Sequence, residues 1–356
     1  MKTSRLHRLE ELLHAAIDAA SLPGAVLAVG IGQDIVYEQA LGFAERLHGV
    51  TRPMTFDTLF DLASLTKVVA TLPSILLLIE RGELRLSDPV THFIPTFTGA
   101  DKEGVTLRHL LTHSSGLPAY REFYRRWSHH DEILAAVITE PLEASPGTQV
   151  VYSDLGFILL GEIVQRVTGQ TLDAFARQQV FEPLGMEQTQ FCPPRELAPH
   201  TAATEDKPEK GVKIGVVHDE NAEALGGVSG HAGLFAPARD LIRYLHMWLG
   251  LPESDDYVLS APTRRLAVQL HMHGTNTARG LGWVLRGDVY DHMGDLWPQT
   301  GAGHTGFTGT SLAFDPTSGL WTVLLTNSVH YGREKNQLMR RLRPLVHNVV
   351  AATLLR

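Results

Sequence analysis

The stretch 61-DLASLTKVVATLPSILLLI-79 joins a short polar turn to the longest apolar segment of the chain, Val68–Ile79. That segment is too short to span a bilayer and is interrupted by polar residues and a proline, so it predicts a buried helix. Ser64 and Lys67 stand three residues apart at the start of this helix, where both side chains lie on one face of its first turn. No other Ser-x-x-Lys occurs in the sequence.

A serine hydroxyl is a weak nucleophile until a neighbouring group accepts its proton. Lys67 accepts it only when its ammonium group is deprotonated or works through a partner, and burial disfavours the charged form. A helix N-terminus also favours an anion that develops beside it. Ser64 and Lys67 are therefore candidate catalytic residues, and a solvent-facing helix turn is the alternative.

The segment 146-PGTQVVYSD-154 predicts a turn and a polar loop just before a helix. Near a cationic lysine, Tyr152 is expected to have a lowered pKa and to relay the proton from Ser64 to the leaving group. The alternative is a core tyrosine, with Ser153 or Asp154 as the N-cap of the helix.

The glycine-rich segment 301-GAGHTGF-307 matches the dinucleotide-binding fingerprint, but that fingerprint requires a helix to follow. Residues 307–314 instead have the pattern of a strand. We therefore interpret the segment as a strand edge against which a substrate lies, with His304 and Thr305 offering hydrogen bonds to a carboxylate or carbonyl group. A tight strand entry with an exposed His is the alternative.

Both ends of the chain predict strands and helices, whereas the middle predicts mostly helices. Helices are expected over residues 5–20 and 334–355, and strands over 25–31, 35–40, 309–314 and 320–326. Helical spacing recurs in the middle over residues 68–81, 106–112, 131–139, 155–168, 172–180 and 238–249. The fold class is α+β: an antiparallel sheet flanked by the N- and C-terminal helices, with an inserted, mostly helical domain. We expect residues 1–62 and 276–356 to form the sheet domain, residues 63–275 the helical domain, and the active site to lie in the cleft between them.

Composition excludes several classes of function. The chain is 44% hydrophobic and 20% charged, with a net charge of −8, so nucleic acid is not an expected partner. The single cysteine, Cys192, excludes an intramolecular disulfide and a Cys-rich metal site. His109 and His113 have the spacing of zinc-protease ligands, but Leu110 stands where those enzymes have their glutamate. We expect no cofactor, no metal and no membrane span. The charged N-terminus predicts a cytoplasmic protein as given, or an exported one if a signal was trimmed.

Taken together, Ser64-x-x-Lys67, Tyr152-x-Asp154 and His304-Thr305-Gly306, in this order, resemble the three motifs of class C β-lactamases and related penicillin-binding serine hydrolases. That family includes DD-carboxypeptidases and esterases. The resemblance extends to 109-HLLTHSSGLP-118, 226-GGVSGHAGLF-235, 281-LGW-283 and 324-LLTN-327.

The resemblance implies two-step acyl transfer, in which Ser64 attacks a carbonyl group and water later releases the acyl group. Lys67 and Tyr152 would share the acid–base work, and the backbone N–H groups of Ser64 and Phe307 would form the oxyanion hole. The implied substrate-binding residues are Asp154, His304, Thr305, Gly306 and Phe307.

Two positions depart from the pattern of the family. The second motif usually ends in Asn, whereas Asp154 cannot donate a hydrogen bond when ionised, and its charge near Lys67 favours the ammonium form and shifts base duty toward Tyr152. The third motif begins with His304 where β-lactamases commonly carry Lys, and a neutral imidazole attracts a β-lactam carboxylate less. We therefore expect D-alanyl-D-alanine carboxypeptidase-like or esterase activity on a small-molecule or peptide substrate (an ester, a D-amino-acyl peptide or a β-lactam). A class C-type β-lactamase and a non-hydrolytic penicillin-binding sensor are the alternatives.

Overall fold

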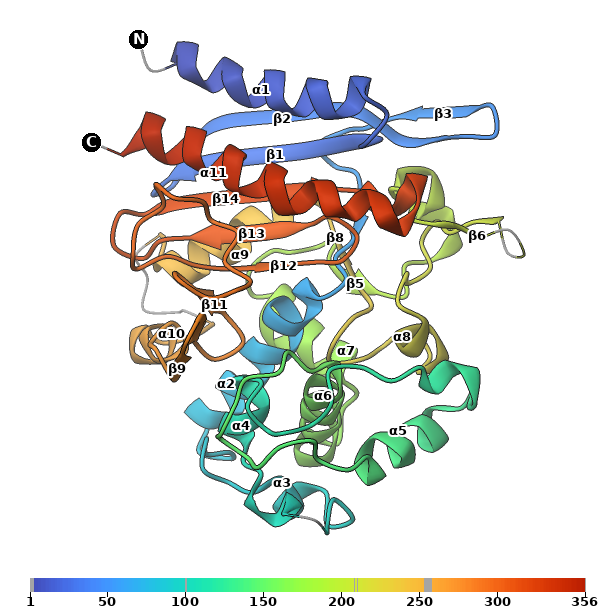
Figure 1. The fold of residues 1–356 in the computed structure, drawn as a ribbon, viewed down its shortest axis with the longest axis vertical. Helices are drawn as coiled ribbons and strands as arrows, with labels where there is room; N and C mark the ends of the chain where they lie inside the picture. Colours follow the sequence, from blue (N-terminus) through green and yellow to red (C-terminus); the bar gives the residue numbers. More distant parts are fainter. Residues whose placement is uncertain (1–2, 100, 208, 210, 253–257, 356) are drawn as a thin grey trace.

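The computed structural model describes residues 3–99, 101–207, 209, 211–252 and 258–355, and within them a nine-stranded sheet forms the centre of the molecule (Figure 1). β1 (Gly24–Ile31) pairs antiparallel with both β2 (Asp34–Leu47) and β14 (Leu320–Thr326), so the two ends of the chain meet inside one sheet. The strand order is β3-β2-β1-β14-β13-β12-β11-β10-β9. The other strands are β3 (Val50–Pro53), β9 (Met272–Gly274), β10 (Thr277–Arg279), β11 (Val284–Leu285), β12 (Ala302–Thr305) and β13 (Ser311–Phe314). The predicted antiparallel sheet is confirmed, and the segment that mimics a dinucleotide fingerprint leads into β13 rather than a helix.

Helices cover both faces of the sheet. α1 (Thr3–Asp18) and α11 (Met339–Leu354) pack against each other and against one face, and α9 (Ala238–Leu249) packs against β1 and β14. Alternate residues of β1 divide between two apolar clusters, with Leu27 on the side of α1 and α11 and Val26 on the side of α9. Because both faces are covered, β1 is an almost continuous apolar run instead of an alternating one.

The remaining helices lie mainly on the other side of the molecule from α1 and α11 (Figure 1). They are α2 (Leu72–Glu80), α3 (Val90–Phe93), α4 (Leu107–Leu111), α5 (His130–Thr139), α6 (Asp154–Thr168), α7 (Leu172–Ala176), α8 (Glu220–Ala224) and α10 (Ala261–Ala267). Two small sheets accompany them: β4 (Phe60–Asp61), β8 (Leu234–Ala236) and β5 (Gln190–Phe191), and β6 (Asp206–Lys207) with β7 (Gly211–Val212). The predicted division of the chain at residues 62 and 275 stays a prediction.

Two helices begin differently from what the sequence pattern predicts. The apolar helix starts with a π-helical turn over Lys67–Thr71, in which the N–H of Leu72 donates to the carbonyl of Lys67, and only then continues as α2. Pro73, at the start of α2, has no N–H to donate, which favours this irregular first turn. The closing helix is preceded by a 3₁₀ segment, Arg333–Leu338.

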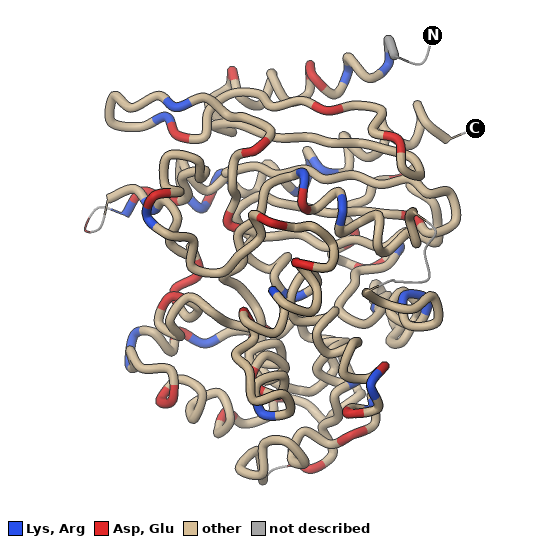
Figure 2. Tube along the Cα trace, turned by 180° about the vertical axis from the view of Figure 1, so that it is seen from behind, with Lys and Arg blue, Asp and Glu red and all other residues tan. Residues whose placement is uncertain are grey.

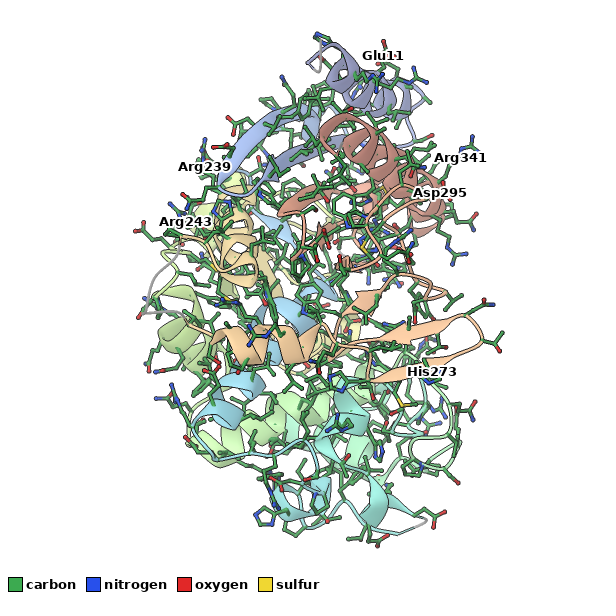
Figure 3. The ribbon with its side chains drawn as sticks, turned by 90° about the vertical axis from the view of Figure 1, so that its left-hand side faces the viewer. Glu11, Arg239, Arg243, His273, Asp295 and Arg341 are labelled. Atoms are coloured by element: carbon green, nitrogen blue, oxygen red, sulfur yellow. The ribbon has the colours of Figure 1, made fainter. Side chains whose placement is uncertain are left out.

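The charged residues are distributed over the whole molecule. Seen from behind, acidic and basic positions are interspersed over the trace, and neither sign gathers in one region (Figure 2). Side chains such as Glu11 on α1, Arg341 on α11 and His273 in the β9–β10 hairpin point outward (Figure 3). None of the helices in the described ranges has both the length and the apolar content that a membrane crossing requires.

Candidate active site

Ser64 lies in a tight turn between β4 and the π-helical turn. Ala63, just before it, has a φ of 46°, a left-handed conformation that a non-glycine residue rarely adopts without support. The support comes from Asp61, whose Oδ1 accepts the N–H of Ala63 at 2.8 Å and whose Oδ2 accepts the N–H of His218 at 2.6 Å. The turn continues with the N–H of Lys67 donating to the carbonyl of Ser64, which fixes Ser64 and Lys67 on the same side.

The ammonium group of Lys67 is fully occupied by acceptors. Its Nζ donates to Ser64 Oγ at 3.1 Å, to Asp154 Oδ1 at 2.7 Å and to the carbonyl of His231 at 3.1 Å. Burial alone lowers the pKa of Lys67, but its interactions with Asp154 and Tyr152 outweigh burial and raise the pKa above its usual value. Lys67 is therefore a cation that donates to Ser64 in this state, as the sequence analysis expected of a lysine beside Asp154.

Tyr152 lies against Lys67, with Nζ 4.9 Å from the ring centroid. The expected lowering of its pKa is wrong. Burial raises the pKa of Tyr152, the charge of Lys67 offsets part of that rise, and the charge of Asp154 adds to it. Tyr152 is thus a neutral phenol at neutral pH, suited to donate a proton. His113, whose ring centroid is 4.6 Å from that of Tyr152, supports the loop because its Nδ1 accepts the N–H of Ser153 at 3.1 Å.

The turn between β12 and β13 packs directly on the segment that precedes Ser64. Thr308 Oγ1 donates to the carbonyl of Asp61 at 2.7 Å, and Thr310 Oγ1 donates to the carbonyl of Leu62 at 3.1 Å. A Cβ at Gly306 would lie 2.4 Å from the carbonyl oxygen of Leu62, so only glycine allows this close approach.

Two backbone donors are available where the β12–β13 turn meets the turn that carries Ser64. Among the hydrogen bonds between described residues, the backbone N–H groups of Ser64 and Phe307 donate to no acceptor. Phe307 is 47% exposed, and its ring stacks on that of His218 at a centroid distance of 5.7 Å. Two free N–H groups on adjoining segments are what an oxyanion hole requires.

His304 and Thr305 end β12 beside Lys67. The ring of His304 lies 6.0 Å from that of Tyr152, and its Nδ1–H donates to the carbonyl of Thr305 at 2.9 Å. Burial, together with the charges of Lys67 and Arg279, holds the pKa of His304 well below its usual value. His304 is thus neutral, as expected, but it is buried, which removes the alternative of an exposed His.

The structure adds residues that the sequence analysis did not single out as part of the site. Besides His113, they are His231 and Asp219, which are joined by a hydrogen bond of 2.9 Å from His231 Nε2 to Asp219 Oδ1. His231 lies in the segment 226–235, which carries part of the resemblance, and Asp219 lies in the segment 218–221. Neither segment has a periodic pattern that indicates which side chain turns inward.

One group of described residues has the donor types that hold a metal ion. Ligand atoms of Asp154, Asp219 and His231 all lie within 4.8 Å of one another. The ammonium of Lys67, 2.7 Å from Asp154, already supplies a positive charge at this position. Lys67 is therefore the cation that the structure places beside these carboxylates.

Comparisons with known proteins agree on one family. The family model described as Beta-lactamase matches residues 9–344. The chain is 32% identical to a putative D-alanyl-D-alanine carboxypeptidase of Escherichia coli (strain K12), over 92% of this chain and 83% of that protein. It is 31% identical to an N-acetylmuramyl-L-alanine amidase of Bacillus subtilis (strain 168), over 92% and 82%. Among solved structures it resembles EstCE1, a hydrolase with promiscuous acyltransferase activity, with a TM-score of 0.78, 24% identity and coverage of 98% and 99%. The expected fold and family are thereby confirmed, and the chain belongs to the β-lactamase family of serine hydrolases.

Proposed function

We propose that this hydrolase forms an acyl-enzyme on Ser64 and cleaves an ester or a D-amino-acyl peptide bond. The observation that carries the proposal is the contact chain from Ser64 Oγ to Lys67 Nζ at 3.1 Å and on to Asp154 Oδ1 at 2.7 Å. A buried chain of this kind accepts the hydroxyl proton at the moment of attack.

The proton balance assigns a role to each group. Lys67 first passes one of its protons to the carboxylate of Asp154, and the neutral amine that results accepts the proton of Ser64 Oγ as this oxygen bonds to the substrate carbonyl carbon. The oxyanion that forms is bound by the N–H groups of Ser64 and Phe307. Tyr152, a neutral phenol, then protonates the leaving group and regains a proton from the Lys67–Asp154 pair. Water takes the place of the leaving group in the second half of the reaction and releases the acyl group.

The charges at the site favour substrates without a carboxylate, such as esters, over β-lactams. A neutral His304 attracts a carboxylate less than a lysine does, and an ionised Asp154 repels one. The carboxypeptidase name of one relative and the amidase name of another support a peptide or amide substrate, whereas the resemblance to EstCE1 is one of fold.

A neighbouring cavity supports an extended acyl group. Its volume is about 980 Å³, and the segment Tyr120–Trp127 and α5 line it. None of the site residues described above lines this cavity, and its link to the site is through the backbone, where the N–H of Asp154 donates to the carbonyl of Ala119, directly before Tyr120. Aromatic side chains from this segment, Phe123 and Trp127 among them, suit a bulky or ring-bearing acyl group.

The proposal is tested by steady-state hydrolysis of p-nitrophenyl acetate and of a peptide ending in D-alanyl-D-alanine. Ser64→Ala should abolish turnover of whichever substrate is cleaved, while Ser87→Ala, which removes an exposed serine hydroxyl, should leave it unchanged. Turnover that survives in a folded Ser64→Ala variant would overturn the proposal. Rapid steady-state cephalosporin hydrolysis would favour a β-lactamase instead, and a single stoichiometric burst would favour a penicillin-binding sensor.

A further inference from the structure

His231 contacts the same ammonium group of Lys67 that donates to Ser64. Its ring is 1% exposed and held on both sides, because Nε2 donates to Asp219 Oδ1 at 2.9 Å and Nδ1 is hydrogen-bonded with Ser229 Oγ at 2.8 Å. A ring fixed at both nitrogens fixes its own backbone, and the His231 carbonyl accepts a proton of Lys67 at 3.1 Å. This contact satisfies the third N–H of Lys67, which otherwise would be a buried donor without an acceptor.

Asp219 links this ring to the start of α8. Its Oδ1 accepts the N–H of Ala222 at 2.8 Å, which makes Asp219 the N-cap of that helix, and the same oxygen accepts from His231. Burial raises the pKa of Asp219, but the charge and hydrogen bond of His231, the Ala222 amide and the charge of Lys67 outweigh burial and hold the pKa well below its usual value. Asp219 is therefore ionised throughout the neutral range.

Asp219 differs in charge from most of the groups that face Lys67. The groups that face Lys67 come from separate elements, and they are Asp154, Tyr152, His113, His304 and Asp219. Both imidazoles have a pKa well below the usual value, and the phenol has a raised one, so these three are neutral at neutral pH. The ionised groups that remain are the two carboxylates, whose oxygens lie within 4.8 Å of each other.

We propose that Asp219 and His231 are positioning residues for the catalytic lysine: His231 holds the ammonium of Lys67 in line with Ser64, and the charge of Asp219 sets the pH range in which the Lys67–Asp154 pair works. Neither residue has a described contact with Ser64, so they act through Lys67. The inference rests on the proposed function, since it assigns this role within the same acyl-transfer reaction.

The charge role predicts a shift with a definite sign. A negative charge beside the Lys67–Asp154 pair makes it bind protons more tightly. Removing that charge should move both limbs of the bell-shaped profile of kcat/KM to lower pH, by about one pH unit for a charge about 5 Å away in a partly solvated site. A residue that only supported the fold would lower activity at every pH without moving the limbs.

Asp219→Asn is the sharpest variant because asparagine caps a helix as well as aspartate does and still accepts from His231. With p-nitrophenyl acetate as the probe, its profile should move to lower pH, and Asp219→Glu, which restores the charge, should return the limbs toward the wild-type positions. Glu223→Gln removes a carboxylate from the same helix, where it pairs with Lys213, and should leave the profile in place.

The positioning role of His231 is tested separately. Ser229→Ala releases one side of the ring without changing any charge, and it should lower kcat while KM and both limbs stay unchanged. An Asp219→Asn enzyme with the wild-type pH profile would overturn the inference, as would equal shifts in Glu223→Gln. These outcomes differ from failure of the proposed function, in which Ser64→Ala would retain the activity of the wild type.

Discussion

Replacing Asp154 by asparagine separates the charge of this residue from its shape. Asparagine keeps the volume and an oxygen that accepts from Lys67, and Ser153, whose Oγ accepts the N–H of Gly156, remains the N-cap of α6. The loss of a negative charge in the first turn of the helix costs about 0.3–1 kcal/mol through the helix dipole. Removing the partner of the buried Lys67 costs about 3–5 kcal/mol more while Lys67 stays charged, and less once Lys67 loses its proton. The fold should survive, so any change in kinetics reports on the pair that Asp154 forms with Lys67.

The ion pair between Lys67 and Asp154 is strong because its atoms are close and largely buried. Asp154 Oδ1 is 2.7 Å from Lys67 Nζ, and the side chains are 17% and 0% exposed. At an effective dielectric constant of about 20, two unit charges at about 3 Å attract by about 5 kcal/mol before desolvation is counted. This attraction is why the pKa of Lys67 is raised in spite of burial. Without it, burial becomes the main influence, and the pKa of Lys67 should fall below its usual value.

The variant should nevertheless be slower at neutral pH. In the wild type the carboxylate of Asp154 takes up the extra proton of the attack. In Asp154→Asn the attack requires that Lys67 has already lost its own proton. A lysine has a reference pKa of about 10.4, and burial lowers it by a few units, so kcat/KM near neutral pH should fall about 10- to 100-fold. The acid limb should move to higher pH by about one to two units, the opposite direction from Asp219→Asn.

The assay is kcat/KM for p-nitrophenyl acetate from about pH 5 to about pH 10, where both limbs of a bell-shaped profile are sampled. Asp240→Asn is the matched control, because Asp240 is a buried carboxylate at the start of α9 that accepts from Thr189 and Gln188 instead of Lys67. A profile of Asp154→Asn that coincides with that of the wild type, or one whose acid limb moves to lower pH, would refute the proton route through Asp154.

Two further predictions concern the frame around the site. Gly306→Ala places a Cβ 2.4 Å from the carbonyl oxygen of Leu62, so the turn that carries the oxyanion donor has to shift. The value of kcat should fall, by up to the roughly 100- to 1000-fold lost on removing one such donor. Gly104→Ala, in open space, should have no effect, and equal kcat values for the two variants would contradict the geometry. Leu13→Ala, at a position that is 0% exposed between α1 and the sheet, should lower the free energy of unfolding by about 2–5 kcal/mol in denaturant titrations. Leu270→Ala, at a position that is 56% exposed, is its control, and similar losses in both would contradict the assigned core.

The parts of the site that are close in sequence were predictable. Ser64 and Lys67 share one helical turn, so a spacing of three residues was enough to place them together. The sheet followed from apolar runs near both chain ends, since strands with both faces covered read as continuous apolar segments.

Features that depend on distant contacts were not predictable in the same way. The pKa of Tyr152 was expected to fall because a lysine was near, but burial is a property of the folded molecule and raises it. The carbonyl of His231 reaches Lys67 across 164 residues of sequence, from a loop without periodicity. The amphipathic pattern of α9 indicates which side is apolar, but it does not indicate that this side packs on β1 and β14.

The central claim is that Ser64 forms a covalent acyl-enzyme, and the most direct test is the intact mass of the protein over time after mixing with benzylpenicillin, followed by peptide mapping, with Ser64→Ala in parallel. Although a neutral His304 attracts the carboxylate of benzylpenicillin only weakly, a high concentration should still acylate the nucleophile, so we expect one penicilloyl group on the wild type, located on Ser64, and none on the variant. An adduct that persists in Ser64→Ala, or one located on another nucleophile such as the thiol of Cys192, would contradict it.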